Sequence, residues 1–166
     1  MSIKLIVLDV DGTMTNGQIT YTQNGDELKS FNVKDGLAIV SWIKLGNYVA
    51  IITGRNSDIV ARRAKELGVK YFYQNIKDKD IVLKTLLDKL NLTMENVAAI
   101  GDDLNDYKML KEVEISFVPN DATIYLEREV DVILSKNGGD GAVREMIEYL
   151  IKKEALEQEY LNLWIK

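Results

Sequence analysis

A chain of 166 residues with 46% hydrophobic and 28% charged residues has the composition of a soluble globular protein, and its length suits one domain spanning residues 1–166. The net charge of −5 argues against nucleic-acid binding through a basic surface, and the absence of Cys and His excludes disulfides, thiolate or histidine catalysis, and zinc sites built from those residues. No apolar run is long enough to predict a secretion signal or a membrane span, so we expect a cytoplasmic protein with no membrane partner.

The first predicted element is a strand at residues 5–8, and two acids follow it directly. Its unbroken apolar run predicts a strand that is covered on both faces, and Gly12 ends the element. Asp9 and Asp11 therefore stand where a strand opens into a loop, the place where open α/β sheets bind ligands. Two carboxylates this close repel each other unless a cation neutralises them. The sequence thus predicts a site for a divalent cation.

Residues 17–31 are predicted to form a β-hairpin. Asn24-Gly25 lies between two alternating runs, which places strands at about residues 18–23 and 26–31. Because an isolated hairpin is only marginally stable, we expect this one to pack against something else.

Beyond the hairpin, helical and strand patterns alternate, which predicts a Rossmann-like, doubly wound parallel α/β sheet. A cap from Asp35 is expected to start the first helix, which ends near Leu45, and Ser57 or Asn56 to start the second. Further helices are expected at residues 79–90, 105–111 and 142–152, and further strands at residues 48–52, 71–73, 97–101, 114–117 and 130–134. The tail, residues 153–166, is expected to be helical or frayed.

Three of the predicted strands end in polar residues that carry chemistry. These are Asp9 with Asp11, Thr53, and Asp102 with Asp103. Because the carboxyl ends of parallel strands share one edge of a sheet, we expect these groups to meet there. Lys79, at the start of a predicted helix, could complete the set. Such a set suits phosphoryl transfer, which needs a nucleophile, countercharges and positioned hydrogen-bond donors.

Each of these residues has a predicted role. Asp9 is the expected nucleophile, forming an aspartyl phosphate, and Asp11 is placed to protonate the leaving oxygen and then to activate water. Mg²⁺ prefers oxygen ligands, for which Asp9, Asp102 and the main-chain carbonyl of Asp11 are the candidates. Thr53 offers a hydroxyl and Gly54 an amide to the phosphate.

The lysine assignment has an alternative. Lys79 is the predicted countercharge for the phosphate, but Lys77 competes with it in the same charged run, where a solvated helix start is common. Asp106 has two readings that the sequence leaves open: an acid at the start of a helix, or the partner that holds Lys79.

The ordered motifs resemble those of the haloacid dehalogenase superfamily: Asp-x-Asp-Gly-Thr at residues 9–13, Thr-Gly at residues 53–54, Lys79, and Gly-Asp-Asp-x-x-Asp at residues 101–106. The resemblance implies a Rossmann-like fold, Mg²⁺ and the roles given above, and Asp11 indicates the phosphatase branch. Members usually carry a cap domain over the site, but the intervals between these motifs are too short to hold one. We therefore expect another subunit to cover the site through the hairpin.

A closer resemblance covers nearly the whole chain, through residues 31–36, 53–55, 63–64, 101–104 and 138–145, which look like the capless sugar-acid phosphatases. That family implies a homotetramer whose hairpins contact neighbouring sites. By position, it implies substrate binding by Asn32, Val33, Lys34, Asp35, Gly36, Gly54, Arg55, Arg63 and Lys79, with Asp103 and Asp106 in support. Arg55 and Arg63 are expected on nearly one helix face, where guanidinium groups can grip a carboxylate.

The family resemblance also implies a substrate class. The expected reaction is Mg²⁺-dependent hydrolysis of 3-deoxy-D-manno-octulosonate 8-phosphate, an eight-carbon sugar-acid phosphate of lipopolysaccharide precursor synthesis. The alternatives are a nine-carbon, sialic-acid-like phosphate (KDN or Neu5Ac 9-phosphate) and a non-catalytic assembly domain of the same fold. Arg55 and the run at residues 34–36 favour the eight-carbon compound, whereas Val40 stands where such proteins often have a basic residue.

Overall fold

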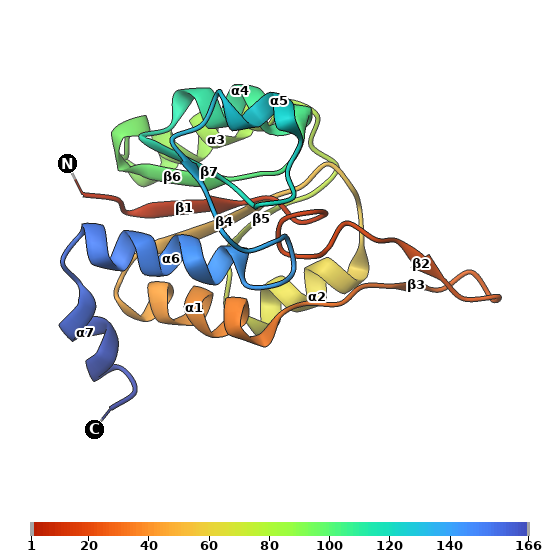
Figure 1. Ribbon diagram of the computed structural model, residues 1–166, viewed down its shortest axis with the longest axis horizontal. Helices are drawn as coiled ribbons and strands as arrows, with labels where there is room; N and C mark the ends of the chain where they lie inside the picture. The colour runs from red at the N-terminus through yellow and green to blue at the C-terminus, as the bar shows by residue number, and fades with distance from the viewer. Residues whose placement is uncertain (1, 166) are drawn as a thin grey trace.

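The computed structural model describes residues 2–165 and contains one six-stranded sheet, in the order β5-β4-β1-β6-β7-β8, whose neighbouring strands are all parallel. The strands are β1 (Leu5–Leu8), β4 (Tyr48–Ile52), β5 (Tyr71–Tyr73), β6 (Val97–Ile100), β7 (Ile115–Val118) and β8 (Val132–Ile133). Helices cover both faces of the sheet (Figure 1), so the predicted doubly wound α/β fold is confirmed.

The two helical layers bury separate apolar cores. One layer holds α1 (Val33–Lys44), α2 (Asp58–Glu66) and α6 (Ala142–Lys153), and the other holds α3 (Lys79–Leu90), α4 (Tyr107–Glu112) and the unpredicted α5 (Ile124–Glu127). Along β1, Ile6 and Leu8 join the first core, while Leu5 and Val7 join the second. This two-sided burial explains why β1 is an unbroken apolar run.

The strand β1 lies at the centre of the sheet and fixes the place of the site. Leu8 pairs with Ile51 of β4 and with Ile100 of β6. The chain fills one side of β1 with β4 and β5 and then crosses to fill the other with β6, β7 and β8. The carboxyl end of β1 is therefore a topological switch point, where open α/β sheets bind ligands.

The start of α1 differs from the prediction. Asn32 caps the helix, because its side-chain oxygen accepts a hydrogen bond from the N–H of Lys34 at 2.8 Å. The predicted cap from Asp35 is wrong: this carboxylate is buried and accepts a hydrogen bond from the N–H of Arg144 at 2.8 Å. Arg144 lies in the first turn of α6, whose own N-cap residue, Gly141, has no side chain. Asp35 thus caps α6 across the interface between the two helices.

Asp35 gives the stability of the fold a pH dependence. Burial raises the pKa of Asp35 to about 6, against 3.8 for an ordinary Asp, although the hydrogen bond from Arg144 opposes the shift. The folded protein therefore keeps this proton where the unfolded chain has lost it, and stability falls as the pH rises from about 4 to about 6.

The variant Asp35→Asn removes this titration and keeps an acceptor for the N–H of Arg144. We expect its free energy of unfolding to exceed that of the wild type by on the order of 2 kcal/mol at pH 7, and to match it at pH 4. Urea denaturation at both pH values measures the difference, and other titrating acids cancel because both proteins contain them. A more stable wild type at pH 7 would contradict the assignment.

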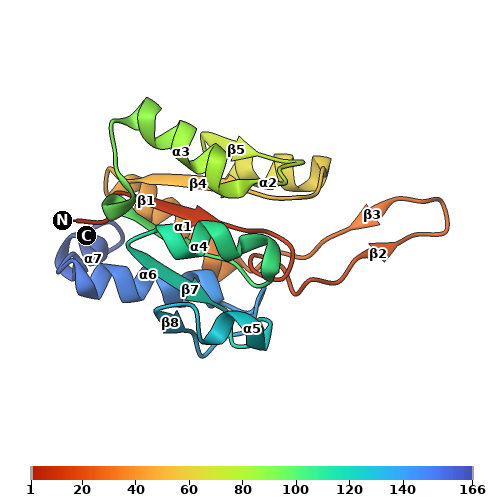
Figure 2. The ribbon, with the colours of Figure 1, turned by 90° about the horizontal axis from the view of Figure 1, so that it is seen from above.

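The predicted hairpin is present and projects from the body of the molecule (Figure 2). Its strands are shorter than predicted, β2 (Thr20–Tyr21) and β3 (Glu27–Leu28). The N–H of Thr22 donates to the carbonyl of Asp26, which closes a three-residue loop with Gly25 in the left-handed region at φ 87°. Because Tyr21 and Leu28 are exposed, little packing within the chain supports a longer ladder.

The tail forms a further helix, α7 (Glu157–Asn162), on the side of the molecule away from the hairpin (Figure 1). Trp164 donates a hydrogen bond from Nε1 to the hydroxyl of Ser41 at 3.1 Å, and the ammonium of Lys44 lies 4.1 Å from the centre of its ring. The tail is thus attached to α1 of its own chain. None of the helices between residues 2 and 165 combines the length and apolar character needed to cross a bilayer.

Candidate active site

A buried lysine joins two of the predicted acids. Lys79 is the first residue of α3, and its Nζ lies 2.5 Å from Oδ1 of Asp9 and 2.5 Å from Oδ1 of Asp106. The lysine side chain is 1% exposed, so these ion pairs are shielded from water. Of the two lysines that the sequence offered, the structure places Lys79 at the site. The sequence left two roles open for Asp106, and the structure shows that it is the partner that holds Lys79.

Asp106 also organises the loop after β6. Its second oxygen, Oδ2, accepts hydrogen bonds from the N–H groups of Asp102 (3.1 Å) and Asp103 (3.4 Å). Gly101 makes room for this carboxylate, because a Cβ there would lie 2.4 Å from Cγ of Asp106. The carboxylate of Asp103 accepts from the N–H of Leu104 at 2.7 Å. Its support of the site is therefore local: it caps the 3-10 turn Leu104–Asp106.

Three carboxylates gather at the carboxyl end of β1 and β6. Oxygen atoms of Asp9, Asp102 and Asp106 lie within 4.8 Å of one another. Gly12 permits the approach of Asp102, since a Cβ at that position would lie 2.0 Å from its Oδ2. The meeting of Asp9 and Asp102 was expected from the sequence, and Asp106 completes the cluster from the 3-10 turn.

The cluster carries more negative charge than the chain neutralises. Burial, and then the charge of Asp106, raises the pKa of Asp9 to about 6 against the opposing effect of Lys79. Burial and the charges of Asp9 and Asp106 raise the pKa of Asp102 to about 8. Burial alone lowers the pKa of Lys79, but the two carboxylates it contacts raise it above its ordinary value.

These residues fit a divalent cation. Three carboxylates face one ammonium group, and a second cation would relieve their repulsion. Both oxygens of Asp106 are engaged by Lys79 and by the loop N–H groups, which leaves Asp9 and Asp102 as the side-chain ligands. Mg²⁺ suits such a site because it prefers a few carboxylate oxygens and keeps several waters. The predicted third ligand, the carbonyl of Asp11, stays a prediction.

Thr53 directly follows β4 and begins a turn that backbone hydrogen bonds hold in place. The residue is 2% exposed, its N–H donates to the carbonyl of Tyr73 at 2.9 Å, and its carbonyl accepts from Ile76 at 3.1 Å. These bonds hold the start of the loop that contains Gly54. The predicted contacts of the Thr53 hydroxyl and the Gly54 amide with phosphate remain predictions.

The carboxylate of Asp11 points to the hairpin and not to the acidic cluster. It forms an ion pair with the ammonium of Lys29, whose side chain is 0% exposed, and lies 3.9 Å from Nε of Arg55. Lys29 was not among the residues predicted for the site. No local pattern indicates this contact, because it depends on how the base of the hairpin folds back on the end of β1.

Arg55 is also held by the hairpin. Its Nη2 lies 3.0 Å from Oε1 of Glu27, whose other oxygen accepts from the hydroxyl of Ser57 at 3.2 Å. Although partial burial favours the neutral form of Glu27, the charge of Lys29 and the hydrogen bonds from Arg55 and Ser57 hold its pKa below the usual value. Arg55 precedes α2, which begins at Asp58. The prediction that Arg55 and Arg63 share one helix face is therefore wrong.

Arg63 lies on α2 and packs beneath the start of α1. Its guanidinium carbon is 5.8 Å from the centre of the Phe31 ring, and its Nη1 pairs with Glu66 at 3.6 Å. Gly36 leaves room for this group, because a Cβ there would lie 2.4 Å from Nη2 of Arg63. Arg63 and Gly36 are therefore in direct contact, and their predicted role in substrate binding stays a prediction.

The other predicted substrate-binding residues, at the start of α1, differ in exposure and in structural role. Val33 and Lys34 are exposed, whereas Asn32 and Asp35 serve as helix caps. Within residues 2–165, no hydrogen bond or ion pair links residues 32–36 with the acidic cluster. Their predicted role in substrate binding stays a prediction.

A glycine-rich loop braces the turn after β1. The N–H of Gly139 donates to the carbonyl of Thr13 at 3.0 Å, and the side chain of Asn32 donates to the carbonyl of Gly139 at 3.4 Å. A Cβ on Gly138 would lie 1.8 Å from the carbonyl oxygen of Gly12. Direct backbone packing thus places residues 138 and 139 against the turn that follows β1.

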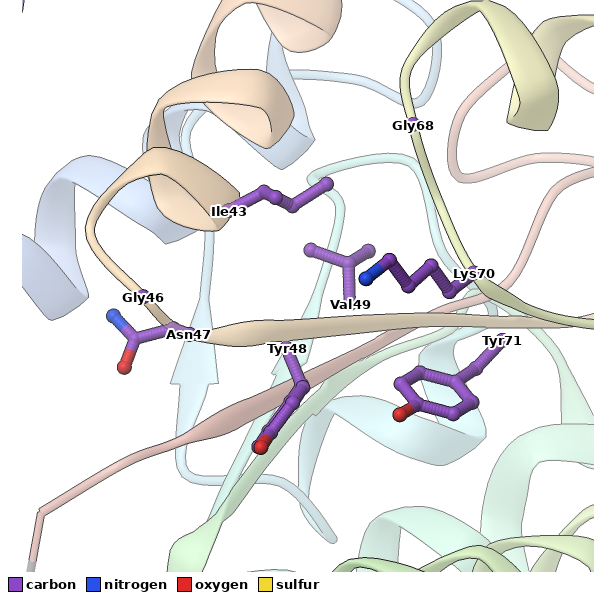
Figure 3. Close-up of a pocket in the computed structure, with 8 residues that line it drawn as sticks. All are labelled: Ile43, Gly46, Asn47, Tyr48, Val49, Gly68, Lys70 and Tyr71. Carbon is purple, nitrogen blue, oxygen red and sulfur yellow. The ribbon is translucent and has the colours of Figure 1, made fainter.

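A pocket of about 190 Å³ lies away from this site, where β4 and β5 begin (Figure 3). Val49 and Lys70 lie on the side of α1, and Tyr48 and Tyr71 lie on the opposite face of the sheet. The acidic cluster is at the other end of these strands. The pocket is therefore separate from the candidate active site, and none of the acidic cluster residues lines it.

The chain is similar in sequence to known hydrolases and phosphatases. A family described as haloacid dehalogenase-like hydrolase matches residues 72–147. The 3-deoxy-D-manno-octulosonate 8-phosphate phosphatase of Haemophilus influenzae is 39% identical over 153 residues, which is 92% of this chain and 85% of that protein. The phosphatase of the same name from Escherichia coli K12 is 41% identical over 150 residues, covering 90% and 80%.

A solved structure extends the similarity to three dimensions. The 3-deoxy-D-manno-octulosonate 8-phosphate phosphatase of Moraxella catarrhalis, solved in complex with a magnesium ion, a phosphate ion and a KDO molecule, matches with a TM-score of 0.94. It is 39% identical, and the match covers 98% of this chain and 93% of that one.

Proposed function

This chain belongs to the haloacid dehalogenase-like hydrolases as a phosphatase, and we propose that it hydrolyses 3-deoxy-D-manno-octulosonate 8-phosphate to the free sugar acid and phosphate with the help of Mg²⁺. The observation that carries the chemistry is the buried Asp9–Lys79–Asp106 ion-pair chain beside Asp102. The similarity to phosphatases of that name along most of the chain supports the substrate. The proposed setting is the synthesis of lipopolysaccharide precursors in the cytoplasm.

In the proposed first step, an oxygen of Asp9 attacks phosphorus and forms an aspartyl phosphate as the ester bond breaks. Asp11 gives its proton to the departing sugar oxygen. Lys79 holds Asp9 in place and, with the ion pair to Asp106, supplies positive charge beside the transferred group. Mg²⁺, held by Asp9, Asp102 and the carbonyl of Asp11, would neutralise part of the phosphate charge.

In the second step, the ionised Asp11 takes a proton from a water molecule, whose oxygen attacks phosphorus. The bond between phosphorus and Asp9 then breaks, which releases phosphate and restores both carboxyl groups. The hydroxyl of Thr53 and the amide of Gly54 are proposed to hold the phosphate oxygens during both steps.

Arg55 is the proposed anchor for the carboxylate of the sugar acid, which would compete with Glu27 for its guanidinium. We expect Arg55→Ala to raise KM for 3-deoxy-D-manno-octulosonate 8-phosphate by about 10- to 100-fold, the effect of losing a charged hydrogen bond, and to change KM for p-nitrophenyl phosphate much less. Steady-state kinetics on both substrates measures this. Arg62→Ala is the matched control, because Arg62 is exposed on α2 and pairs with Glu66. Equal effects of Arg55→Ala on both substrates would refute carboxylate recognition.

The two alternatives make different predictions. A nine-carbon sugar-acid phosphatase would show a higher kcat/KM on KDN or Neu5Ac 9-phosphate than on the eight-carbon compound. A non-catalytic assembly domain would release no phosphate from either. The intact set of Asp9, Asp11, Lys79 and Asp102 favours the enzyme, and a comparison of kcat/KM on both sugar acids separates the three cases.

We also propose a homotetramer in which the hairpin contacts a neighbouring site. Apolar side chains are exposed on the hairpin and on the adjoining start of α1, namely Ile19, Tyr21, Leu28, Val33 and Leu37. Light scattering at micromolar concentration should give four times the chain mass of 18.8 kDa. Leu28→Asp should reduce that mass, since a charge would enter the proposed contact. A monomeric wild type would refute the assembly.

A further inference from the structure

The base of the hairpin contributes a buried cation to the active site of its own chain. The side chain of Lys29 is 0% exposed, and its ammonium contacts the carboxylate of Asp11. A second carboxylate, Glu27, lies 3.6 Å from the same ammonium. Burying an ammonium group is costly unless it is paired, so the buried position of Lys29 depends on its ion pairs with these two acids.

Glu27 connects the two cations that surround Asp11. It pairs with Arg55 at 3.0 Å as well as with Lys29, and Arg55 in turn lies 3.9 Å from Asp11. The side chains of Asp11 and Glu27 are 20% and 18% exposed and that of Arg55 is 42% exposed, so Lys29, at 0%, is the one member of this network whose side chain is shut off from solvent. The four side chains thus form one ion-pair network beside the carboxyl end of β1.

We propose that Lys29 is a positioning residue for Asp11: it fixes the direction of the carboxyl group that exchanges a proton with the oxygen of the leaving alcohol. This inference rests on the proposed acid–base role of Asp11. The carboxyl group follows a loop and can turn about its side-chain bonds, whereas proton transfer requires it within hydrogen-bond reach of the ester oxygen. The buried ammonium of Lys29 restricts the rotation of the Asp11 carboxyl group, and Glu27 in turn holds Lys29 in place.

The leaving group makes this role measurable. A sugar or glycerol oxygen leaves as a poor alkoxide unless it is protonated, whereas p-nitrophenolate leaves readily without a proton. Losing Lys29 should therefore reduce kcat/KM for alkyl phosphates and spare the aryl phosphate. An ammonium that contacts the phosphate would affect all esters alike, and one that binds the substrate carboxylate would leave glycerol 1-phosphate unaffected.

The test compares Lys29→Met with the wild type on the eight-carbon sugar-acid phosphate, glycerol 1-phosphate and p-nitrophenyl phosphate. We expect kcat/KM to fall by about 10- to 100-fold for both alkyl esters, the scale of a small misplacement of a catalytic group, and by about threefold or less for the aryl ester. Lys29→Arg should recover part of the loss, because it keeps a cation at this position. Lys108→Met, a change of the same kind at an exposed lysine, is the control for charge removal.

A double-mutant cycle gives the decisive result. If Lys29 acts through Asp11, Lys29→Met should change kcat/KM by less than about twofold when it is added to Asp11→Asn. A further large loss in that background, or an equal loss on all three esters in the single variant, would overturn the proposal. So would an unchanged kcat/KM on both alkyl esters. Failure of the proposed substrate is a separate outcome, because glycerol 1-phosphate and the aryl ester test Lys29 without it.

Discussion

Asp9→Asn is expected to lose at least about 10³-fold in kcat while it keeps its fold, because the amide cannot form an aspartyl phosphate. Asp9 is also one of three crowded carboxylates, and burial raises its pKa to about 6. Removing its charge relieves repulsion with Asp102 and Asp106, so we expect the melting temperature to stay equal or to rise. Phosphate release and thermal unfolding measure the two effects.

Mass spectrometry of rapidly quenched reactions tests the covalent step itself. The wild type should gain the mass of a phosphoryl group on the peptide that contains Asp9, and Asp9→Asn should not. Asp88→Asn, at an exposed position on α3, is the matched control and should behave as the wild type. Substantial turnover by Asp9→Asn would rule out nucleophilic catalysis by this residue.

Lys79→Met is expected to have the largest effect on stability. The change leaves Asp9 and Asp106 buried without their shared cation, and loss of one partner from a buried ion pair costs about 3–5 kcal/mol. The loss of stability should grow as the pH rises. Without Lys79, the buried carboxylates of Asp9 and Asp106 favour the protonated form, whereas the unfolded chain releases these protons, so a higher pH favours unfolding. Turnover should also fall, since the transferred phosphate loses its countercharge.

Urea denaturation of Lys79→Met at pH 5 and pH 8 measures this effect. Lys77→Met is a close control, because Lys77 is two residues away, exposed, and the competing candidate in the sequence. The double variant Lys79→Met/Asp106→Asn should recover part of the lost stability by removing one of the orphaned charges. Equal stability of the two single variants would show that the buried ion pairs contribute nothing.

The predicted meeting of Asp9 and Asp102 could be read from the sequence because each of them directly follows a buried strand. The apolar run of β1 could be recognised because both faces of that strand are covered, and Asp9 and Asp102 then meet because neighbouring parallel strands end at one edge. Lys79 was predicted from its place at a helix start and from the resemblance to the haloacid dehalogenase superfamily. Its ion pair with Asp106 needed the structure, because two readings of that acid were equally consistent with the sequence.

The residues that sequence reasoning misplaced depend on contacts between elements. Asp35 has the local character of a helix cap, yet it caps a different helix because α1 packs against α6. Arg55 was assigned to a helix face, but the chain does not become helical until Asp58. Lys29 gave no signal at all, since its burial arises from the fold of the hairpin base against Asp11.

The most direct test of the proposed function measures phosphate release from 3-deoxy-D-manno-octulosonate 8-phosphate by the purified chain, with Mg²⁺ and after chelation with EDTA. We expect release with kcat/KM of at least about 10⁴ M⁻¹s⁻¹ in Mg²⁺, no release after chelation, and recovery when Mg²⁺ is restored. Asp9→Asn should release none under any of these conditions. Absence of release in Mg²⁺, or equal release with and without the metal, would contradict a magnesium-dependent phosphatase acting on this sugar acid.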